Sequence, residues 1–384
     1  MFFVSTLDPR GLKFSPSLLV NLLYLLHRMR KLFIGLFVIF ILVWVYASAQ
    51  KSPATLPSAA PTGSDETIIA DKLQIPWSLV FLPDGSMLFT ERPGRVREIS
   101  VSGKLNANPV ETVKDVKAIG EGGLLGIELH PSFEKNRFLY LYYTYAGNEN
   151  RTSNKVVRYI FDGTRLSDPK IIVSDIPGNS NHNGGRLKFG PDGYLYITTG
   201  DSQNPSLAQD KSSLAGKILR VTDEGKPAPG NPFNNEIYSY GHRNPQGLAW
   251  DESGRLWETE HGSSTGDEIN LIEKGNNYGW PTITKTQAKA GMVTPVLNSE
   301  NETWAPSGLA FVKPFLYFAG LRSNTLYRLG TTTMKFDMLL KGKYGRLRDV
   351  VLGPDGYLYL TTSNLDGRSL THLDGDKIIR LAPP

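Results

Sequence analysis

From residue 66 onward, short apolar runs alternate with turn sequences, and one arrangement recurs along the chain. An apolar strand is followed by a Pro-Asp-Gly type turn and then by a second strand rich in aromatic and β-branched residues, which is the pattern of a β-hairpin. The clearest copies are LVFLPDGSMLFTE (79–91), LKFGPDGYLYITTG (187–200), LAWDESGRLWETE (248–260) and VVLGPDGYLYLTT (350–362), and looser copies occur at 127–144 and 309–320. The pattern predicts six hairpins.

A further short amphipathic strand follows each hairpin. These strands are GRVREIS (94–100), NKVVRYIF (154–161), GKILRVT (216–222), DEINLIE (267–273), NTLYRLG (324–330) and DKIIRLA (376–382). Units of this kind that repeat every ~40–60 residues are typical of a radial β-architecture with one blade per unit. We therefore predict an all-β, six-bladed β-propeller, in which ETIIADKL (66–73) pairs with the last blade and hides the open sheet edges.

The aromatic residues of these repeats have a structural interpretation. We expect Tyr194, Tyr196, Tyr357 and Tyr359 to pack between blades, and the Asp-Gly pairs to supply the positive φ angles of tight turns. Function is therefore expected in the loops that vary between repeats.

The N-terminal region has the pattern of an export signal. Basic residues RMRK precede the uncharged run LFIGLFVIFILVWVYASAQ (32–50), which ends in small residues. We expect residues 1–50 to be a signal peptide or an uncleaved membrane anchor, with Met29 as a hypothetical true start. Residues 51–64 form a Pro/Ala/Ser linker, and the propeller domain spans 65–384. The protein is then exported to the periplasm or the outside, and contacts a membrane only through residues 32–48.

Charge and cysteine content exclude several classes of function. The formal net charge is +5, but five of the 42 basic residues and only one of the 37 acidic residues lie in the first 50 positions. The remaining body is nearly neutral, so nucleic-acid binding is not expected. The absence of cysteine excludes disulfides, thiolate chemistry and cysteine metal sites.

Six connecting segments are too specific in composition to be simple turns. They are IGEGGLLGIELHP (119–131), NSNHNGGRL (179–187), YGHRNPQGLAW (240–250), ETEHGSSTGDEINLIEKGNNYGWP (258–281), WAPSGLAF (304–311) and GRLRDVVLGPDG (345–356). In a propeller such junctions gather at one end of the central channel, so residues distant in sequence can meet there.

These segments are rich in arginine and contain no clustered set of acidic metal ligands. They carry Arg186, Arg243, Arg346 and Arg348 together with Asn244 and His182. Guanidinium groups that converge on one pocket repel each other unless an anion lies among them, so the pocket predicts an anionic, polycarboxylate ligand. In the alternative, each arginine pairs with a local acid, for example Arg348 with Asp349 or Asp355.

The body from Ile75 to Arg380 resembles the glucose/sorbosone dehydrogenase family. The resemblance rests on GHRNPQGLAW, DEINLIEKGNNYGWP and GEGGLLGIELHP. It implies a six-bladed propeller with pyrroloquinoline quinone in the channel mouth. The implied reaction is oxidation of the anomeric hydroxyl of aldose sugars to lactones, with hydride transfer to the quinone and reoxidation by an external electron acceptor.

The resemblance also implies roles for individual residues. His182 corresponds to the general base, a role that suits an imidazole on a preorganised loop. Arg243 and Asn244 resemble the groups that hold and polarise the ortho-quinone. Arg346 and Arg348 match a pair that contacts the cofactor and its carboxylates, and Arg322 lies where the family often has a basic residue.

A calcium ion clamps the quinone in the family, and its main-chain carbonyl ligands match Gly262 and Ser263 here. Three positions depart from the family pattern. Glu121 replaces a glutamine, Asn181 replaces an acid, and Ser263 replaces a common proline. We expect Glu121 and Asn181 on the substrate side, where the charge of Glu121 would alter substrate preference. His130, His242 and His261 are interpreted as scaffold, with the last two near the site.

Two other functions remain open from the residues alone. The first is a metal-dependent lactonase-type hydrolase, which needs an open divalent site of carboxylates and amides. The second is a secreted propeller without catalysis that acts as a binding module, because a fold does not guarantee a function.

Overall fold

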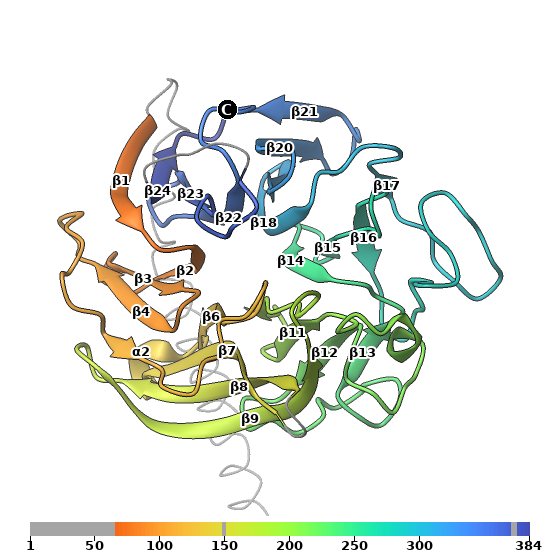
Figure 1. Ribbon diagram of the computed structural model, residues 1–384, viewed down its shortest axis with the longest axis horizontal. Coiled ribbons are helices and arrows are strands. Elements are labelled where there is room, and N and C mark those ends of the chain that lie inside the picture. Colours follow the sequence, from red (N-terminus) through yellow and green to blue (C-terminus); the bar gives the residue numbers. More distant parts are fainter. Residues whose placement is uncertain (1–65, 148–150, 370–374) are drawn as a thin grey trace, which may run out of the picture. The chain divides into compact units, whose positions relative to one another are not determined.

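The computed structural model describes residues 66–147, 151–369 and 375–384, which form six four-stranded antiparallel sheets around a central axis (Figure 1). This confirms the predicted six-bladed propeller. The expected signal or anchor, the linker and the alternative start at Met29 lie outside the described residues. None of the helices in the described part of the chain is long and apolar enough to cross a membrane.

The blades follow one another along the chain. Blade 1 contains β2 (Pro76–Phe81), β3 (Met87–Glu91), β4 (Arg95–Ile99) and β5 (Glu111–Thr112). Blade 2 contains β6 (Leu124–Leu129), β7 (Phe138–Ala146), β8 (Thr152–Phe161) and β9 (Leu166–Gly178). Blade 3 contains β10 (Leu187–Phe189), β11 (Leu195–Thr199), β12 (Lys217–Val221) and β13 (Ile237–Tyr240).

The second half repeats the arrangement. Blade 4 contains β14 (Pro245–Trp250), β15 (Leu256–Glu260), β16 (Glu268–Ile272) and β17 (Leu297–Asn298). Blade 5 contains β18 (Pro306–Val312), β19 (Phe315–Gly320), β20 (Thr325–Gly330) and β21 (Phe336–Leu339). Blade 6 contains β22 (Leu347–Leu352), β23 (Leu358–Thr362), β24 (Asp376–Leu381) and the first strand of the chain, β1 (Glu66–Leu73). The described helices are short: α2 (Phe133–Asn136) and one 3₁₀ turn (Pro205–Ala208).

The ring is closed by the pairing of β1 with β24. The two strands run antiparallel, with Glu66 opposite Leu381 and Leu73 opposite Asp376. The predicted pairing of residues 66–73 with the last blade is therefore confirmed. Because β1 completes the C-terminal blade, both edges of β24 are paired. The two ends of the described domain are thereby joined by backbone hydrogen bonds.

The Pro-Asp-Gly turns anchor the packing between blades. Asp192 accepts hydrogen bonds from the backbone of Tyr194 and from the hydroxyl of Tyr196. Tyr196 is buried and packs edge-on against Trp250 of the next blade, as predicted, and Tyr359 is buried in the same way in the last blade. Tyr194 is half-buried, packs against the same cluster as Tyr196, and lies beneath the guanidinium of Arg220.

The first tyrosine of the turn in the last blade, Tyr357, behaves like Tyr194 in blade 3. Tyr357 is half-buried and stacks with the guanidinium of Arg380. Both half-buried tyrosines also pack against the apolar clusters that join two neighbouring blades. The prediction that all four tyrosines pack between blades is therefore confirmed, with the second tyrosine of each turn the more deeply buried.

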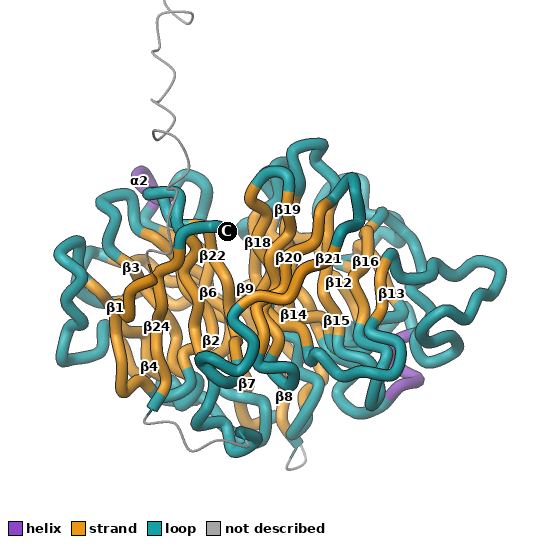
Figure 2. Tube along the Cα trace, turned by 90° about the horizontal axis from the view of Figure 1, so that it is seen from above, coloured by secondary structure: helices purple, strands orange, loops and turns teal. Residues whose placement is uncertain are grey.

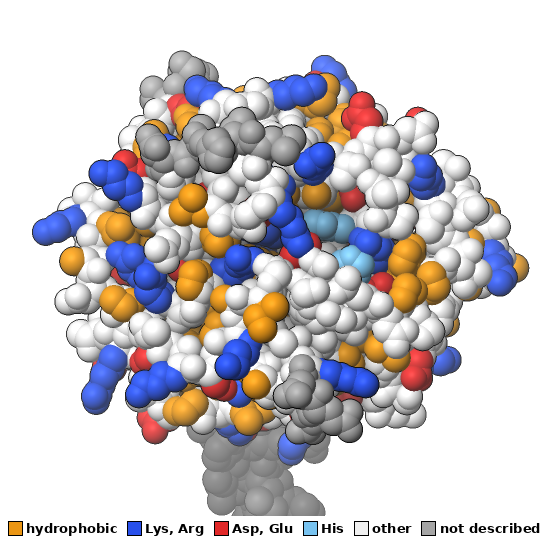
Figure 3. All heavy atoms as spheres, viewed as in Figure 1, with side chains coloured by type: hydrophobic (Ala, Val, Ile, Leu, Met, Phe, Trp, Pro, Cys, Tyr) orange, Lys and Arg blue, Asp and Glu red, His pale blue; other side chains and the backbone are white. Residues whose placement is uncertain are grey.

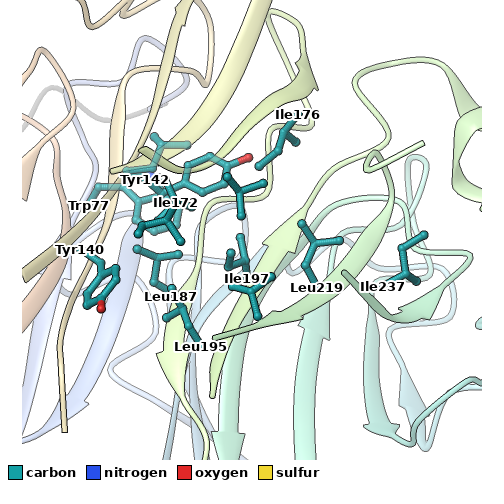
Figure 4. Packing of buried hydrophobic residues seen from close by; sticks show 14 residues of the cluster. Trp77, Tyr140, Tyr142, Ile172, Ile176, Leu187, Leu195, Ile197, Leu219 and Ile237 are labelled. Atoms are coloured by element: carbon teal, nitrogen blue, oxygen red, sulfur yellow. The ribbon is translucent and has the colours of Figure 1, made fainter. Parts of the chain in front are cut away.

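The apolar core lies between neighbouring sheets. In Figure 4, Trp77 of β2, Tyr142 of β7, Leu187 of β10 and Ile197 of β11 belong to one cluster that joins blades 1, 2 and 3. Each fully buried large apolar side chain contributes roughly 1.5–3 kcal/mol. Such clusters fix the angle between blades, and so fix the position of the loops at the ends of the strands.

The first strands of the blades line the central axis, and those of adjacent blades contact one another around the ring. Loops gather at both ends of the strands, seen as the teal segments in Figure 2. The loops that enter the first strands and leave the second strands lie at the same end. This end therefore brings together the segments around residues 121, 182, 243, 262 and 346.

Candidate active site

A cleft of about 530 Å³ opens at this end of the channel. Its volume lies in the range of about 300–1,000 Å³ that small-molecule sites occupy. Its polar wall includes Glu121, Gln246, His261, Arg322, Arg346, Arg348 and Arg368. Figure 3 shows histidine side chains next to Lys and Arg side chains near the middle of this face.

The loop that carries His182 is held tightly against strand β11. His182 has a φ of +59°, in the left-handed region that a residue other than glycine adopts at a cost. Gly200 allows this approach, since a Cβ there would lie 2.0 Å from the His182 carbonyl oxygen. The hydroxyl of Tyr142 donates to the Asn183 carbonyl at 2.7 Å. The sequence thus builds a rigid loop around the histidine.

The His182 imidazole is oriented by a buried carboxylate. Its Nδ1 lies 2.7 Å from Oδ1 of Asp201, which is fully buried, while the histidine side chain is 17% exposed. Trp280 Nε1 donates to the other Asp201 oxygen at 2.8 Å. An ionised carboxylate only accepts hydrogen bonds, so the proton of the neutral ring lies on Nδ1. The lone pair of Nε2 is then available to a substrate proton.

Glu121 connects the histidine to the cleft. One of its oxygens accepts the His182 backbone N–H at 3.0 Å, and the other accepts Arg368. Arg368 also donates to the side-chain oxygen of Asn181. Burial alone would raise the pKa of Glu121, but Arg368, His261 and the His182 N–H outweigh it, so its pKa lies below the usual value. Glu121 and Asn181 therefore lie beside His182 and share Arg368.

Arg243 and Asn244 contact the residues on either side of the His182–Asp201 pair: the Arg243 carbonyl accepts the Asp201 backbone N–H at 2.8 Å. Arg243 donates to the carbonyls of His261 and Ser263 at 3.2 and 3.3 Å, and burial lowers its pKa. Asn244 is fully buried, and its side-chain oxygen accepts the Gly184 backbone N–H at 3.0 Å. These two residues thus join the His182 loop to the loop that follows β15.

Arg346 and Arg348 both line the cleft, but their charges are balanced differently. Arg346 donates through two nitrogens to Oδ2 of Asp366, at 3.0 and 2.8 Å. Arg348 lies 3.9 Å from the same oxygen and donates to Gln246 at 2.8 Å. Burial, reinforced by Arg346, lowers the pKa of Arg348 to about 9. Arg348 is therefore a buried cation with incomplete compensation.

The sequence left open that each of the four arginines, Arg186, Arg243, Arg346 and Arg348, pairs with an acid instead of a ligand. Two of the four do so at hydrogen-bond distance. Arg346 pairs with Asp366, and Arg186 pairs with Asp349 at 3.0 Å. The specific pairs suggested for Arg348 are wrong, because Asp349 binds Arg186, and Asp355 binds Arg380 at 2.8 Å.

Two members of the arginine set lie apart from the others. Arg186 lines a separate, smaller pocket of about 210 Å³, which is formed with residues of the first strands of several blades. Arg186 is therefore not among the residues that line the cleft. Its position follows from the inward direction of its side chain at the start of β10. Arg322 lies on the wall of the cleft but is exposed to solvent.

Several buried donors around the cleft have no hydrogen-bond partner within the described residues. They are Arg243 Nε, Asn244 Nδ2 and Arg348 Nε, and Nε2 of His261 likewise has no partner. Burial lowers the pKa of His261 to about 3, with the neighbouring arginines adding to the effect. Unpartnered buried donors are rare in folded proteins. This set fits a ligand rich in oxygen acceptors, and a quinone with several carboxylates has that chemistry.

The predicted calcium ligands lie on the loop between β15 and β16. Oδ1 of Asp267 accepts the Gly262 backbone N–H at 2.8 Å, and its Oδ2 accepts the Trp304 N–H at 2.6 Å. This buried carboxylate fixes the loop. The Ser263 carbonyl already accepts Arg243, so it is only partly free as a ligand for a cation.

A buried acidic cluster lies below this loop, contrary to the expectation of no clustered acidic ligands. Ligand atoms of His242, Glu258 and Glu260 lie within 4.8 Å of one another. The sequence did not indicate it, because His242 lies before β14 and meets alternate residues of β15 only when these two strands of blade 4 pair. Ser239 and Glu260 occupy both nitrogens of His242, at 2.8 and 2.9 Å. All three side chains are buried, so the cluster has no opening toward a substrate, which a metal hydrolase needs.

Sequence reasoning missed three residues of the site. Asp201, Asp366 and Arg368 orient His182, Arg346 and Glu121, respectively. Asp201 follows β11 in a glycine turn and resembles an ordinary turn residue. The sequence Asp-Gly-Arg at 366–368 could have been noted as a polar turn after the last predicted hairpin, but its partners are distant in sequence.

Comparisons with known proteins agree with this geometry. The family model of the glucose/sorbosone dehydrogenases matches residues 73–372. The aldose sugar dehydrogenase YliI of Escherichia coli is 36% identical over 348 residues, which cover 81% of this chain and 93% of that protein. A crystal structure of the soluble aldose sugar dehydrogenase of Escherichia coli in its apo-form is 33% identical, with a TM-score of 0.77, and covers 84% of this chain and all of that chain.

A third relative was solved with its cofactor. The PQQ-bound aldose sugar dehydrogenase of Streptomyces coelicolor is 39% identical, with a TM-score of 0.77, and covers 84% of this chain and 99% of that chain. Fold, cleft and relatives together define a propeller dehydrogenase. The chain belongs to the glucose/sorbosone dehydrogenase family.

Proposed function

We propose that the protein oxidises the anomeric hydroxyl of aldose sugars to lactones, with pyrroloquinoline quinone as the hydride acceptor and His182 as the general base. The observation that carries the proposal is the 2.7 Å contact of His182 Nδ1 with Asp201, which leaves Nε2 for the substrate beside the cleft. The relatives named above, one of them solved with this quinone, support the choice of cofactor.

His182 would take the proton of the sugar hydroxyl on Nε2. The buried carboxylate of Asp201 stabilises the imidazolium that forms, and Trp280 keeps that carboxylate in place. Glu121 and Asn181 lie next to His182 and would orient the other sugar hydroxyls as hydrogen-bond acceptors.

The buried donors without a partner support a cofactor position next to the arginine residues of the cleft. Arg348 and Arg346 would hold carboxylates, and Arg322 at the exposed wall would add a further positive charge. Arg243 and Asn244, whose Nε and Nδ2 atoms lack partners, would bind and polarise the quinone oxygens. An external electron acceptor completes the turnover.

Calcium is proposed at the main-chain oxygens of Gly262 and Ser263. Oxygen ligands suit this hard cation. The Arg243 contact to the Ser263 carbonyl is long, at 3.3 Å, and would have to be given up or shared. Dye reduction by the quinone-loaded protein should then fall after chelation and return with calcium, whereas activity that is indifferent to chelation contradicts this site.

The test of the proposed function is an assay of the purified protein with pyrroloquinoline quinone, calcium, a redox dye and a panel of aldoses. We expect aldose-dependent dye reduction that is lost in His182→Ala and kept in His130→Ala, a control on the outer turn after β6. Hydrolysis of lactones without quinone would instead support the hydrolase. Neither activity would support a binding module.

We also propose that residues 1–50 direct export to the periplasm or the outside, on the sequence pattern alone. Fractionation of cells and N-terminal sequencing test it. A protein found only in the cytoplasm would contradict the proposal. A mature chain that begins at Met1 would exclude Met29 as the start, and a chain that begins after Ala49 would agree with a cleaved signal.

A further inference from the structure

Arg368 connects three loops at the mouth of the cleft. It lies on the loop between β23 and β24, at the wall of the cleft, and its side chain is 42% exposed. One terminal nitrogen donates to Glu121, on the loop before β6, and the other donates to Asn181, on the loop before β10. A guanidinium can donate to two side chains at once, because its donors have a fixed planar geometry.

The base of Arg368 is itself fixed. Oδ1 of Asp366 accepts the Arg368 backbone N–H at 2.9 Å, while Oδ2 holds the buried Arg346. The turn that presents Arg368 is thus built on the carboxylate that neutralises the cofactor side of the cleft. The position of the guanidinium over Glu121 is therefore set by buried contacts, unlike that of an ordinary surface arginine.

The contact reaches His182 through Glu121. The second oxygen of Glu121 accepts the backbone N–H of His182, the residue with the left-handed φ of +59°. Both oxygens of the carboxylate are thereby oriented, one by Arg368 and one by His182. A loss of Arg368 frees one oxygen of Glu121 and removes the cation beside its charge, so the carboxylate can rotate and its pKa should rise.

We propose that Arg368 is a positioning residue that fixes Glu121 and Asn181 as acceptors beside His182 and makes the sugar pocket selective for uncharged aldoses. This inference rests on the proposed function. The pair of Arg368 and Glu121 has no net charge, so the wall next to the base neither attracts nor repels an ionised sugar. Removal of either partner leaves one charge of known sign at that wall.

The sign of the remaining charge predicts the change in substrate preference. Arg368→Gln leaves the Glu121 carboxylate and should favour the cationic sugar D-glucosamine. Glu121→Gln leaves the Arg368 guanidinium and should favour D-glucuronate. We expect each preference, measured as kcat/KM relative to D-glucose near neutral pH, to move by about 5–10-fold, since the pair is partly exposed. The double variant should return to the preference of the wild type.

The pH profile separates positioning from a general structural effect. Without Arg368, the acid limb of kcat/KM should move to higher pH, because Glu121 loses the cation that holds it ionised. Arg368→Lys keeps the positive charge but cannot donate to Glu121 and Asn181 from two nitrogens. The acid limb of kcat/KM should therefore stay in place, while KM rises because the two acceptors are less well positioned. The matched control is Arg255→Gln, an arginine 43% exposed and paired with Asp251 at 2.6 Å, on the turn at the far end of blade 4.

A second readout needs neither quinone nor sugar. In the apoprotein, hydrogen exchange of the His182 amide should be faster in Arg368→Gln than in the wild type and Arg255→Gln, because its acceptor is no longer fixed. Unchanged exchange together with unchanged preferences and pH profile overturns the proposal. If the wild type oxidises no aldose, the proposed function fails, and the exchange experiment still reports whether Arg368 positions Glu121.

Discussion

Nδ1 of His182 lies 2.7 Å from Oδ1 of Asp201, and the two residues flank the open end of the hairpin formed by β10 and β11, His182 before β10 and Asp201 after β11. The same Asp201 oxygen accepts the Gln203 backbone N–H at 2.8 Å, and the other accepts Trp280. A buried, fully hydrogen-bonded carboxylate that orients an imidazole is the arrangement that sets a catalytic histidine in one tautomer.

Asp201→Asn should reduce kcat strongly while KM changes little. An amide at this position can donate to Nδ1, which places the ring proton on Nε2, where the base is needed. We expect a loss of about 10²–10⁴-fold, the range for general base catalysis. Steady-state dye reduction measures it. The control is Asp210→Asn, whose carboxylate caps Ser212 on the same loop; equal losses in both variants would show a mere loop effect.

Arg348→Met and Arg346→Met should have opposite effects on the stability of the apoprotein. Arg348 is a buried cation with an unpartnered Nε, so its removal should raise the free energy of unfolding by about 1–3 kcal/mol. Loss of Arg346 leaves the buried Asp366 without its main partner, so Arg346→Met should lower the free energy of unfolding by about 3–5 kcal/mol. Urea unfolding distinguishes the two.

The gain in stability from Arg348→Met should come at the expense of quinone binding. A lost charged hydrogen bond is worth about 1.5–3 kcal/mol, or roughly 10–150-fold in Kd. Fluorescence titration with pyrroloquinoline quinone measures the change. Tight binding in Arg348→Met would show that this arginine does not contact the cofactor.

The propeller could be predicted from the sequence because its signals are local. Each hairpin carries its own turn and its own alternation of apolar residues, and residues 66–73 have the same alternation. The fourth strands of the first five blades were not predicted, and two of them, β5 and β17, contain only two residues each. Two residues show no period, and only the neighbouring strand makes them part of a sheet.

The site was predictable only where one segment carries the signal. His182 stands out on its glycine-rich loop, and Arg346 and Arg348 stand two residues apart. By contrast, Arg368 meets Glu121 from 247 residues away in the sequence. The balance of charge in the cleft depends on such distant pairs, so the sequence alone could not tell that Arg346 is neutralised and Arg348 is not.

Gly200→Ala should impair activity more than stability alone explains. A Cβ at this position would lie 2.0 Å from the His182 carbonyl oxygen, so the loop has to move away from β11 and shift the imidazole from Asp201. We expect a loss of kcat of at least about 10²-fold, the effect of a small misplacement of a catalytic group. The control is Gly193→Ala, where a Cβ meets open space and φ is +79°. This variant should lose some stability from the positive φ but keep its kcat. Full activity in Gly200→Ala would contradict the tight packing of this loop.

Lys217 should give the protein a stability that rises with pH. The side chain is fully buried, and its ammonium donates to the carbonyls of Leu207, Ala208 and Ala215 at 2.7, 3.1 and 2.5 Å. Burial lowers its pKa to about 7, whereas an unfolded chain has a lysine pKa of about 10.4. Between these values the unfolded state binds more protons than the folded state, so the free energy of unfolding increases with pH.

Below pH 7 this cost of burying the charge is fully present, and above pH 10 it has disappeared. Lys217→Met should therefore flatten the pH dependence of the free energy of unfolding between about pH 7 and 10. Urea unfolding across this range tests it, with the exposed Lys226→Met as the control that keeps the slope of the wild type. An unchanged slope in Lys217→Met would mean that the three carbonyl acceptors hold the ammonium charged throughout, and that the loop carrying Asp201 is stabilised by a permanent internal cation.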